Sequence, residues 1–546
     1  MMKEIFKAAG SLGRATVRTI IFSFIFSEIF CSCTKFLKEE NKTQYSVDYI
    51  YSSPDGLKLS VNALYALQRG LFGDNNGNES PTWWALERGT DIVASCGGTG
   101  NFYGIYDPSY LKPSAAQVGI LWKTLYQIIG RCNEIIWYGE RMEDSEELRT
   151  AIAEARCFRA QSYFHLFRVY DRIWLNTVPV TSANVDDVRE YRAATSAEVY
   201  ALLYEDLEYA AANLPWKSYE NGRFNQAVAR HLLAKAALWK KDWQTALDQI
   251  DAIEESKQFA LLDSPAAVFN AADLNHSEAM MTQQWSDQPG GNFSAATAKG
   301  NQFCTLFIAQ YRTALGGKDD ESCSAENWGY TFGRILPNPY LLSLYDQARD
   351  KRWNDWYIHR YRNTRNVEVT YNSVKVKPGD YLPAHTGGSG DPRYTMPGCT
   401  KWGDVWTKTP AEKRGFKDVV LYRLADSYIV GAEAALRLGD QTKAKFYFNK
   451  TWQRAGNDEF TGTLTMQDII DEEAREMAFE NDRWFFLKRL GILIDQVSQH
   501  AGNPIYAASL KGRTNLPANP QFVRWPIPES EIINMGEENF HQNPGY

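Results

Sequence analysis

Residues 424–444 read LADSYIVGAEAALRLGDQTKA, and this stretch predicts two antiparallel helices joined by a tight turn. Ala434-Ala435 lies near the end of the first apolar run, Gly439-Asp440 supplies a short polar turn, and Ala444 opens the packed face of the next run. Small side chains allow two helices to approach closely, as they do in tetratricopeptide-like hairpins.

An earlier segment follows the same pattern. Ala236-Ala237-Leu238 precedes Lys241-Asp242, and Ala246 then begins the packed face of another helix. The two matches are far apart and degenerate, so they do not indicate a regular solenoid. The expected fold is therefore mostly α, with about four helical hairpins forming a scaffold and only minor β structure.

Other runs also show helical signals. Apolar residues recur at helical spacing in 56–72, 116–142 and 146–169. Thr195 precedes a further run, and Glu198 lies three positions later, which is the spacing of a capping box.

Long inserts without helical periodicity separate these runs. They cover residues 73–115, 286–334 and 363–416, and the last includes a strand-like alternation over 367–376. Segments of this length in a compact protein are usually binding loops or disordered, and their aromatic content argues against disorder. We therefore expect a loop-rich ligand face on a helical scaffold.

The N-terminus has the pattern of a processing segment. A basic start is followed by an apolar stretch over 17–30, which is too short to span a bilayer and favours a signal peptide. Ser32-Cys33 after this stretch predicts a lipobox with Cys33 as the acylated residue. The expected organisation is a signal peptide over 1–32 and a single domain over 33–546. The alternative is an ordinary secretory signal with incidental cysteines.

Composition and motifs argue against several classes of function. The chain has 546 residues and a net charge of −7, and it lacks the basic block that nucleic-acid binding requires. Its cysteines and seven histidines form no short ligand motif, so no metal site or cofactor is expected, although a structural calcium is left open. The stretch 387–391 nearly matches G-x-S-x-G but ends in Asp, so the chain is not expected to be an enzyme.

Ligand binding has a better basis in the inserts. Sugars present apolar C–H faces that stack on aromatic rings, and their hydroxyl groups need amide or charged partners. The candidate ligand-binding residues combine these side-chain types. They are Trp83, Trp84, Asp91, Asn101, Tyr103 and Tyr106, with Trp285, Trp328 and Tyr330 as a second wall. The alternative for the adjacent indoles is that one of them packs beneath its loop.

The C-terminal third resembles the SusD/RagB family of nutrient-binding outer-membrane lipoproteins. The resemblance rests on the hairpin at 424–440, on REMAFE and RWFFLKR within 475–489, and on the closing segments 526–531 and 542–546. Phe486 stands where the family commonly has Asp. Weaker matches earlier in the chain extend the resemblance over the mature protein, in order.

Spacing within residues 472–491 predicts one helix whose apolar residues face a core and whose charged residues pair with one another. The expected core residues are Met477, Phe479, Trp484 and Leu487. The expected pairing residues are Arg475, Glu476, Glu480 and Arg483.

The resemblance implies a lipid-anchored protein at the cell surface, in the outer membrane, that delivers an oligosaccharide to a SusC-like TonB-dependent transporter. Three alternatives remain open: capture of peptides on the same scaffold, an exported helical-repeat scaffold for protein assembly, and a helical glycoside hydrolase.

Overall fold

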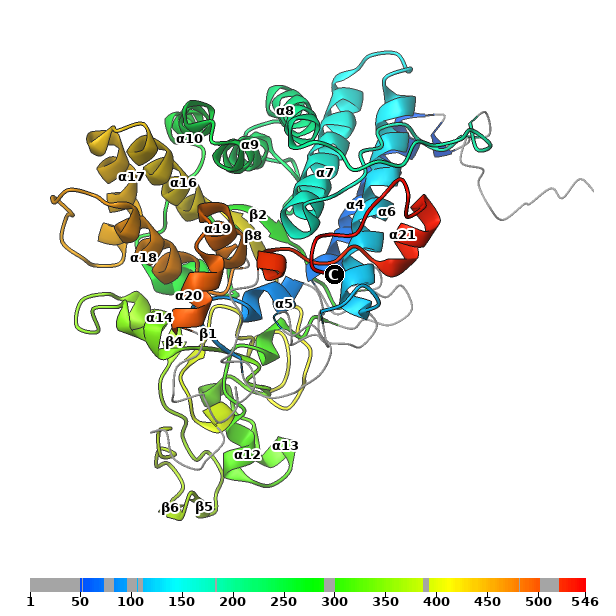
Figure 1. Cartoon of the computed structure of the whole chain (residues 1–546). Helices are drawn as coiled ribbons and strands as arrows, with labels where there is room; N and C mark the ends of the chain where they lie inside the picture. Colours follow the sequence, from blue (N-terminus) through cyan, green and yellow to red (C-terminus); the bar gives the residue numbers. More distant parts are fainter. Residues whose placement is uncertain are drawn as a thin grey trace, which may run out of the picture. The chain divides into compact units, whose positions relative to one another are not determined.

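In the computed structural model of the chain, the long helices of residues 54–546 pack side by side in chain order (Figure 1). Helix α6 contacts α7, α7 contacts α8, α8 contacts α9, and α9 contacts α10. Helix α10 then contacts α16, which pairs with α17. The long helices are α4 (Pro54–Phe72), α6 (Ala116–Gly139), α7 (Glu146–Tyr170), α8 (Ser196–Asn213), α9 (Gln226–Lys240), α10 (Trp243–Ser256), α16 (Leu424–Arg437), α17 (Gln441–Arg454) and α18 (Met466–Met477).

The structure describes residues 50–51, 53–72, 83–95, 106, 111–181, 184–288, 300–385, 392–480, 482–500 and 520–546. Residues 54–546 form one compact unit. The expected signal peptide and Cys33 lie outside the described residues. No helix in the described part is both long and apolar enough to cross a membrane.

Both predicted hairpins are confirmed. Lys241 ends α9 in the left-handed conformation, and Asp242 caps α10 by accepting from the backbone of Thr245. Gly439 has a φ of 84° at the corresponding turn, where an L side chain would be strained. Asp440 then caps α17. The alanines expected to face the neighbouring helix are fully buried, namely Ala236, Ala237, Ala246, Ala434, Ala435 and Ala444.

The capping box is also confirmed, because Thr195 and Glu198 bond reciprocally at the start of α8. Shorter helices and turns fill the connections between the long helices. They are α5 (Trp83–Arg88), α11 (Pro265–Val268), α12 (Tyr311–Leu315), α13 (Asp319–Ser322), α14 (Pro339–Ser343), α15 (Arg352–Asp355), α19 (Arg483–Leu490), α20 (Leu493–His500) and α21 (Glu529–Met535).

The strands form short antiparallel pairs, and three of the four pairs join segments that are at least 40 residues apart. The pairs are β1 (Val93–Ser95) with β3 (Ile335–Pro337), β2 (Ala279–Gln283) with β8 (Val419–Arg423), β4 (Tyr357–Ile358) with β7 (Gly398–Cys399), and β5 (Val369–Tyr371) with β6 (Val374–Val376). The alternation at 367–376 is therefore a hairpin. Its turn residues Asn372 and Ser373 both have positive φ, as a tight two-residue hairpin turn requires.

The loop-rich part between β2 and β8 has a hydrophobic core of its own. Ile308, Leu336 and Leu382 are buried in it, and the rings of Tyr311 and Tyr361 stack with centroids 5.4 Å apart. Figure 1 shows α12, α13 and the β5–β6 hairpin on the side away from the stacked helices. Loops supported by such a core can hold side chains in fixed positions on the surface.

The region 472–491 corrects one prediction. It contains two helices, α18 and α19, because the chain turns at Phe479, whose φ is 66°. The four expected core residues are buried, as predicted. The charged residues, however, pair mainly with other segments. Glu476 contacts Arg352, Arg423 and Arg454, and two pairs lie within 472–491, namely Arg475 with Glu472 and Arg483 with Glu473.

Candidate functional site

Asp91, a predicted ligand contact, is part of the framework. Its side chain is fully buried, and its two carboxylate oxygens accept hydrogen bonds of 2.8 and 2.6 Å from Arg483. Its backbone carbonyl accepts from Asn338. Because both carboxylate oxygens are bound to α19 and no surface is open, Asp91 does not contact a ligand, and this assignment is corrected.

The other residues of the first predicted wall are partly described. Trp83 and Trp84 open α5, and their side chains, together with Asn101 and Tyr103, lie outside the described residues. Tyr106 donates its hydroxyl hydrogen to the carbonyl of Gly89. Burial raises the pKa of Tyr106 well above its ordinary value, so this hydroxyl remains a neutral donor that is already engaged.

Two residues of the second predicted wall are buried. Trp285 is 6% exposed, and its indole nitrogen donates to Gln283. Tyr330 is 4% exposed and is covered by Arg312, whose guanidinium carbon lies 3.9 Å from the ring centroid. Neither residue can present a ring face to a ligand, because protein atoms already cover it. These two assignments are therefore corrected as well.

Trp328, the remaining residue of that wall, forms a surface pair with Trp406. The two indole centroids are 5.5 Å apart at an interplanar angle of 75°, an edge-to-face arrangement. Trp328 is partly buried against the core of the loop-rich part, whereas Trp406 is 52% exposed. Trp406 was not among the predicted residues. The sequence places it in the third insert but has no local signal that separates it from the buried Trp402.

Backbone contacts fix this Trp pair in place. Asp404 accepts from the backbone N–H groups of Trp406 and Thr407, at 3.1 and 3.0 Å, which forms a tight turn. The indole of Trp328 lies directly on Gly403, where any Cβ would overlap the ring. The pair therefore needs an Asx-type turn and a residue without a side chain, and both come from the segment 403–407.

Asn327, the residue before Trp328, connects to a second exposed ring through Arg362. Asn327 exchanges hydrogen bonds with the backbone of Arg362, and the Arg362 guanidinium donates to the hydroxyl of Tyr381. Tyr381 is 42% exposed, and Arg360 also lies over its ring. Trp406 and Tyr381 are thus two exposed rings of the loop-rich part, and guanidinium donors lie beside the second.

Two cavities on the helical side are possible alternatives. One, of about 260 Å³, is lined by polar residues that include Asn62, Gln68 and Gln283. The other, of about 680 Å³, lies where α4, α7 and α8 meet and is lined by Glu147 and Tyr219, among others. No indole lines either cavity, so they offer hydrogen bonds but much less surface for stacking.

One cluster resembles a catalytic triad in geometry. The Nδ1 of His231 lies 2.9 Å from the Ser427 hydroxyl, and its Nε2 lies 3.1 Å from the Asp426 carboxylate. Ser427 and His231 have no exposed surface, so no substrate can reach the hydroxyl. Among the described residues, no group of three or more His, Cys, Asp and Glu side chains could hold a metal ion.

Comparisons with known proteins agree with the fold. Residues 284–546 match a family model described as "SusD family", and residues 97–238 match one described as "Starch-binding associating with outer membrane". SusD-like protein P25 of Formosa agariphila is 23% identical, with 94% of this chain and 96% of that protein covered.

Solved structures are similar over most of the chain. A laminarin-binding SusD-like protein is 20% identical, with a TM-score of 0.68, and the match covers 90% of this chain and 99% of that one. The surface glycan-binding protein A of Bacteroides uniformis is 18% identical, with a TM-score of 0.67 and the same coverage. At these identities the likeness establishes the fold and leaves the ligand open.

Proposed function

Because the chain belongs to the SusD/RagB family, we propose that it captures a glycan on the surface around Trp328 and Trp406 and delivers it to a SusC-like TonB-dependent transporter. The observation that carries this proposal is the half-exposed indole of Trp406, braced by Trp328 on an ordered loop. Two relatives of similar fold have names that state glycan binding, which supports the same ligand class.

The physical basis is stacking of sugar C–H faces on the rings. Covering about 100 Å² of indole at about 25 cal/mol per Å² contributes about 2.5 kcal/mol. Stacking on Trp406 and Tyr381 together, with a few hydrogen bonds, gives an affinity between about millimolar and micromolar. Such an affinity suits a protein that must release its ligand to a transporter.

We also propose a lipid anchor and a second wall of the binding surface. Acylated Cys33 tethers the chain to the outer membrane at the cell surface, and Trp83 and Trp84 extend the binding surface from the first insert. Replacing Cys33 with Ser should move the protein from the membrane fraction to the soluble fraction. Retention of the C33S variant in membranes would argue against the lipid anchor.

Affinity electrophoresis with immobilised glycans tests the ligand site. Trp406→Ala and Trp328→Ala should each weaken retention at least about tenfold, since each removes roughly 2 kcal/mol of ring contact. The matched control is Trp452→Ala, which removes a partly exposed Trp of α17 that packs on Phe448. Unchanged retention in both test variants would refute this site, and binding of peptides in place of glycans would favour the peptide alternative.

The first insert is tested separately. The double variant Trp83→Ala, Trp84→Ala should lose glycan retention with little change in melting temperature. Full retention by this variant would remove the first insert from the binding surface and leave the Trp328–Trp406 surface in place.

A further inference from the structure

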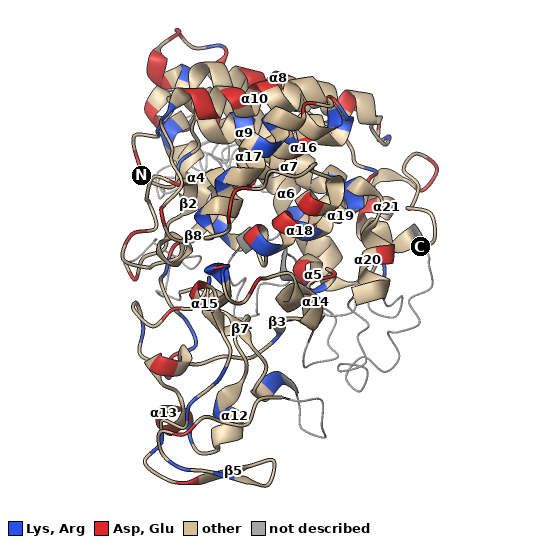
Figure 2. Ribbon diagram, turned by 90° about the vertical axis from the view of Figure 1, so that its left-hand side faces the viewer, with Lys and Arg blue, Asp and Glu red and all other residues tan. Residues whose placement is uncertain are grey.

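The loop-rich part differs in charge from the rest of the chain. Residues 300–423 contain 18 Lys and Arg but 13 Asp and Glu, a balance of +5 within a chain of net charge −7. The helices α8 and α10, in contrast, carry acidic residues and no Lys or Arg, as Figure 2 shows on the opposite side of the unit. Part of the excess is internal, because Arg352, Lys401 and Arg423 neutralise buried carboxylates.

The loop that carries Trp406 also has two lysines that neutralise no buried carboxylate. Lys408 and Lys413 follow Trp406 on the same loop, and neither forms a salt bridge with a carboxylate among the described residues. The ammonium group of Lys408 donates one hydrogen bond to the backbone carbonyl of Glu412. The Nζ of Lys408 lies 3.5 Å from the position that a Cβ of Gly329 would occupy, next to Trp328. The Nζ of Lys413 lies 5.0 Å from the ring centroid of Tyr330.

A third lysine adds positive charge beneath the rings. Lys417 is 6% exposed and donates to the carbonyls of Lys401 and Gly403, and its Nζ lies 5.3 Å from the ring centroid of Trp406. Burial lowers the pKa of Lys417 to about 8, and Asp404 opposes that shift, so the ammonium group is mainly charged at neutral pH. A buried charge is screened by salt much less than an exposed one.

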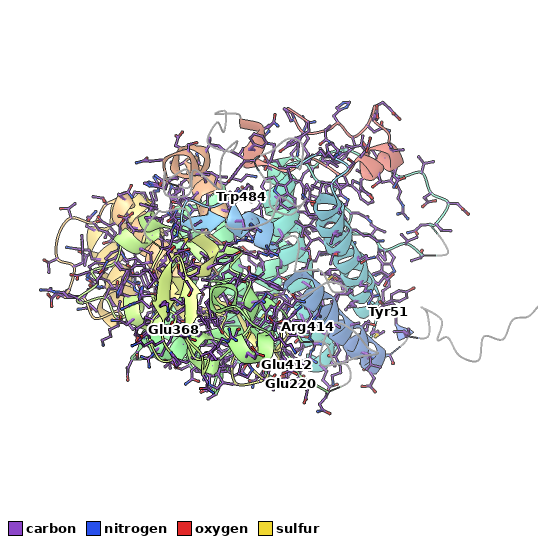
Figure 3. All side chains as sticks on the ribbon, turned by 90° about the horizontal axis from the view of Figure 1, so that it is seen from below. Tyr51, Glu220, Glu368, Glu412, Arg414 and Trp484 are labelled. Atoms are coloured by element: carbon purple, nitrogen blue, oxygen red, sulfur yellow. The ribbon has the colours of Figure 1, made fainter. Side chains whose placement is uncertain are left out.

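The acidic side chains nearby are already engaged. Glu412 accepts from the backbone of Thr409, and Glu326 pairs with Arg362 at 3.0 Å. Asp404 is buried and occupied by the backbone of its own turn. Figure 3 shows Glu412 and Arg414 of this loop well apart from the core residue Trp484. Hydrogen bonds do not remove the charge of these carboxylates, but residues 404–417 contain four Lys and Arg and two Asp and Glu. The loop that carries Trp406 therefore has a net charge of +2.

Building on the proposed function, we infer that the glycan bound at Trp328 and Trp406 is anionic and that Lys408 and Lys413 bind its carboxylate or sulfate groups. The indole supports the sugar ring, and the lysines select a charged ring substituent. Ammonium groups suit this role because each provides three donors and a compact charge to an anionic oxygen. Neutral glycans can still stack on the rings, but they gain nothing from the lysines.

Matched polysaccharide pairs test this inference, because each pair shares a backbone and differs only in charge. One arm compares a panel of sulfated polysaccharides with their desulfated forms, and the other compares uronic acid polymers with their carboxyl-reduced forms. Titration calorimetry at low and high NaCl gives the dissociation constants. For at least one pair, the charged member should bind about tenfold more tightly at low salt, and the difference should shrink as salt screens the contacts.

The double variant Lys408→Gln, Lys413→Gln should remove most of that preference and keep the affinity for the neutral member. Its control is Lys123→Gln, Lys377→Gln, which neutralises two exposed lysines outside the patch and should leave the preference intact. Melting curves verify that both variants fold. Equal binding of charged and neutral members by the wild type would overturn the inference and leave glycan capture standing, whereas no binding to any glycan would refute both.

Discussion

Arg483 on α19 binds Asp91 through two nearly parallel hydrogen bonds, although the two residues are 392 positions apart. The same guanidinium also donates to Glu473 on α18 at 2.6 Å. All three side chains are buried. This arrangement connects the middle of the first insert to the C-terminal helices, so the segment after Trp83 and Trp84 is held by residues that belong to the family-like C-terminal motif.

Breaking this connection should destabilise the protein. Asp91→Ala leaves part of the Arg483 charge without its partner, which is expected to cost about 3–5 kcal/mol of unfolding free energy. Arg483→Lys keeps the charge but loses the forked geometry, and the expected loss is about 2 kcal/mol. Urea unfolding measures both values. The control Glu147→Ala removes an exposed pair with Lys58 and should change stability by less than about 1 kcal/mol. Equal effects in the three variants would contradict this role.

The charge cluster around Glu476 should make stability sensitive to acid. Burial by itself would raise the pKa of Glu476, but Arg454, Arg423 and Arg352 lower it well below its ordinary value. The charged form therefore stabilises the fold above the unfolded-state pKa of about 4.3, and this contribution is lost as the pH falls below that value. Glu476→Gln should lower stability at pH 7 by about 3–5 kcal/mol.

The deficit of Glu476→Gln relative to wild type should shrink between about pH 4 and pH 2, because protonation then removes the same charge from the wild type. Thermal unfolding at a series of pH values measures this difference. A deficit that stays constant over that range would show that Glu476 does not carry the acid sensitivity.

Gly403 should matter for binding more than its position in a loop suggests. Its backbone is open to an L residue, but a Cβ would overlap the indole of Trp328. Gly403→Ala should therefore displace Trp328 from Trp406, weaken glycan retention several-fold, and cost about 1–3 kcal/mol of stability through overpacking. Affinity electrophoresis and tryptophan fluorescence report the two effects. Normal retention would show that binding does not depend on the placement of Trp328.

Two helical glycines should respond in opposite ways to the same substitution. Gly130 on α6 is exposed, and a Cβ added there would meet no other atom within 4 Å, so Gly130→Ala should stabilise the protein by about 0.5–1 kcal/mol. Gly431 on α16 faces Ile250 and Tyr447, each 2.9 Å from a Cβ position. Gly431→Ala should cost about 1–3 kcal/mol. Melting temperatures that shift in the same direction would contradict the close packing of α10, α16 and α17.

The sequence by itself determined the helical framework. The hairpins at Lys241-Asp242 and Gly439-Asp440 and the capping box at Thr195 could be predicted because turns, caps and small packing residues act over a few neighbouring positions. The break at Phe479 could not, because residues 472–491 keep helical spacing throughout and the left-handed turn depends on the surrounding core.

Tertiary structure alone decided which side chains are available to a ligand. Asp91 and Trp285 look suitable in sequence, but Arg483 binds the carboxylate of Asp91, and Trp285 is only 6% exposed. Trp406 has no distinguishing local signal, and it is exposed because Gly403 and Asp404 turn the chain toward Trp328. Periodicity and capping depend on nearby residues, whereas burial depends on partners that the fold brings from hundreds of positions away, and these partners determine the surface.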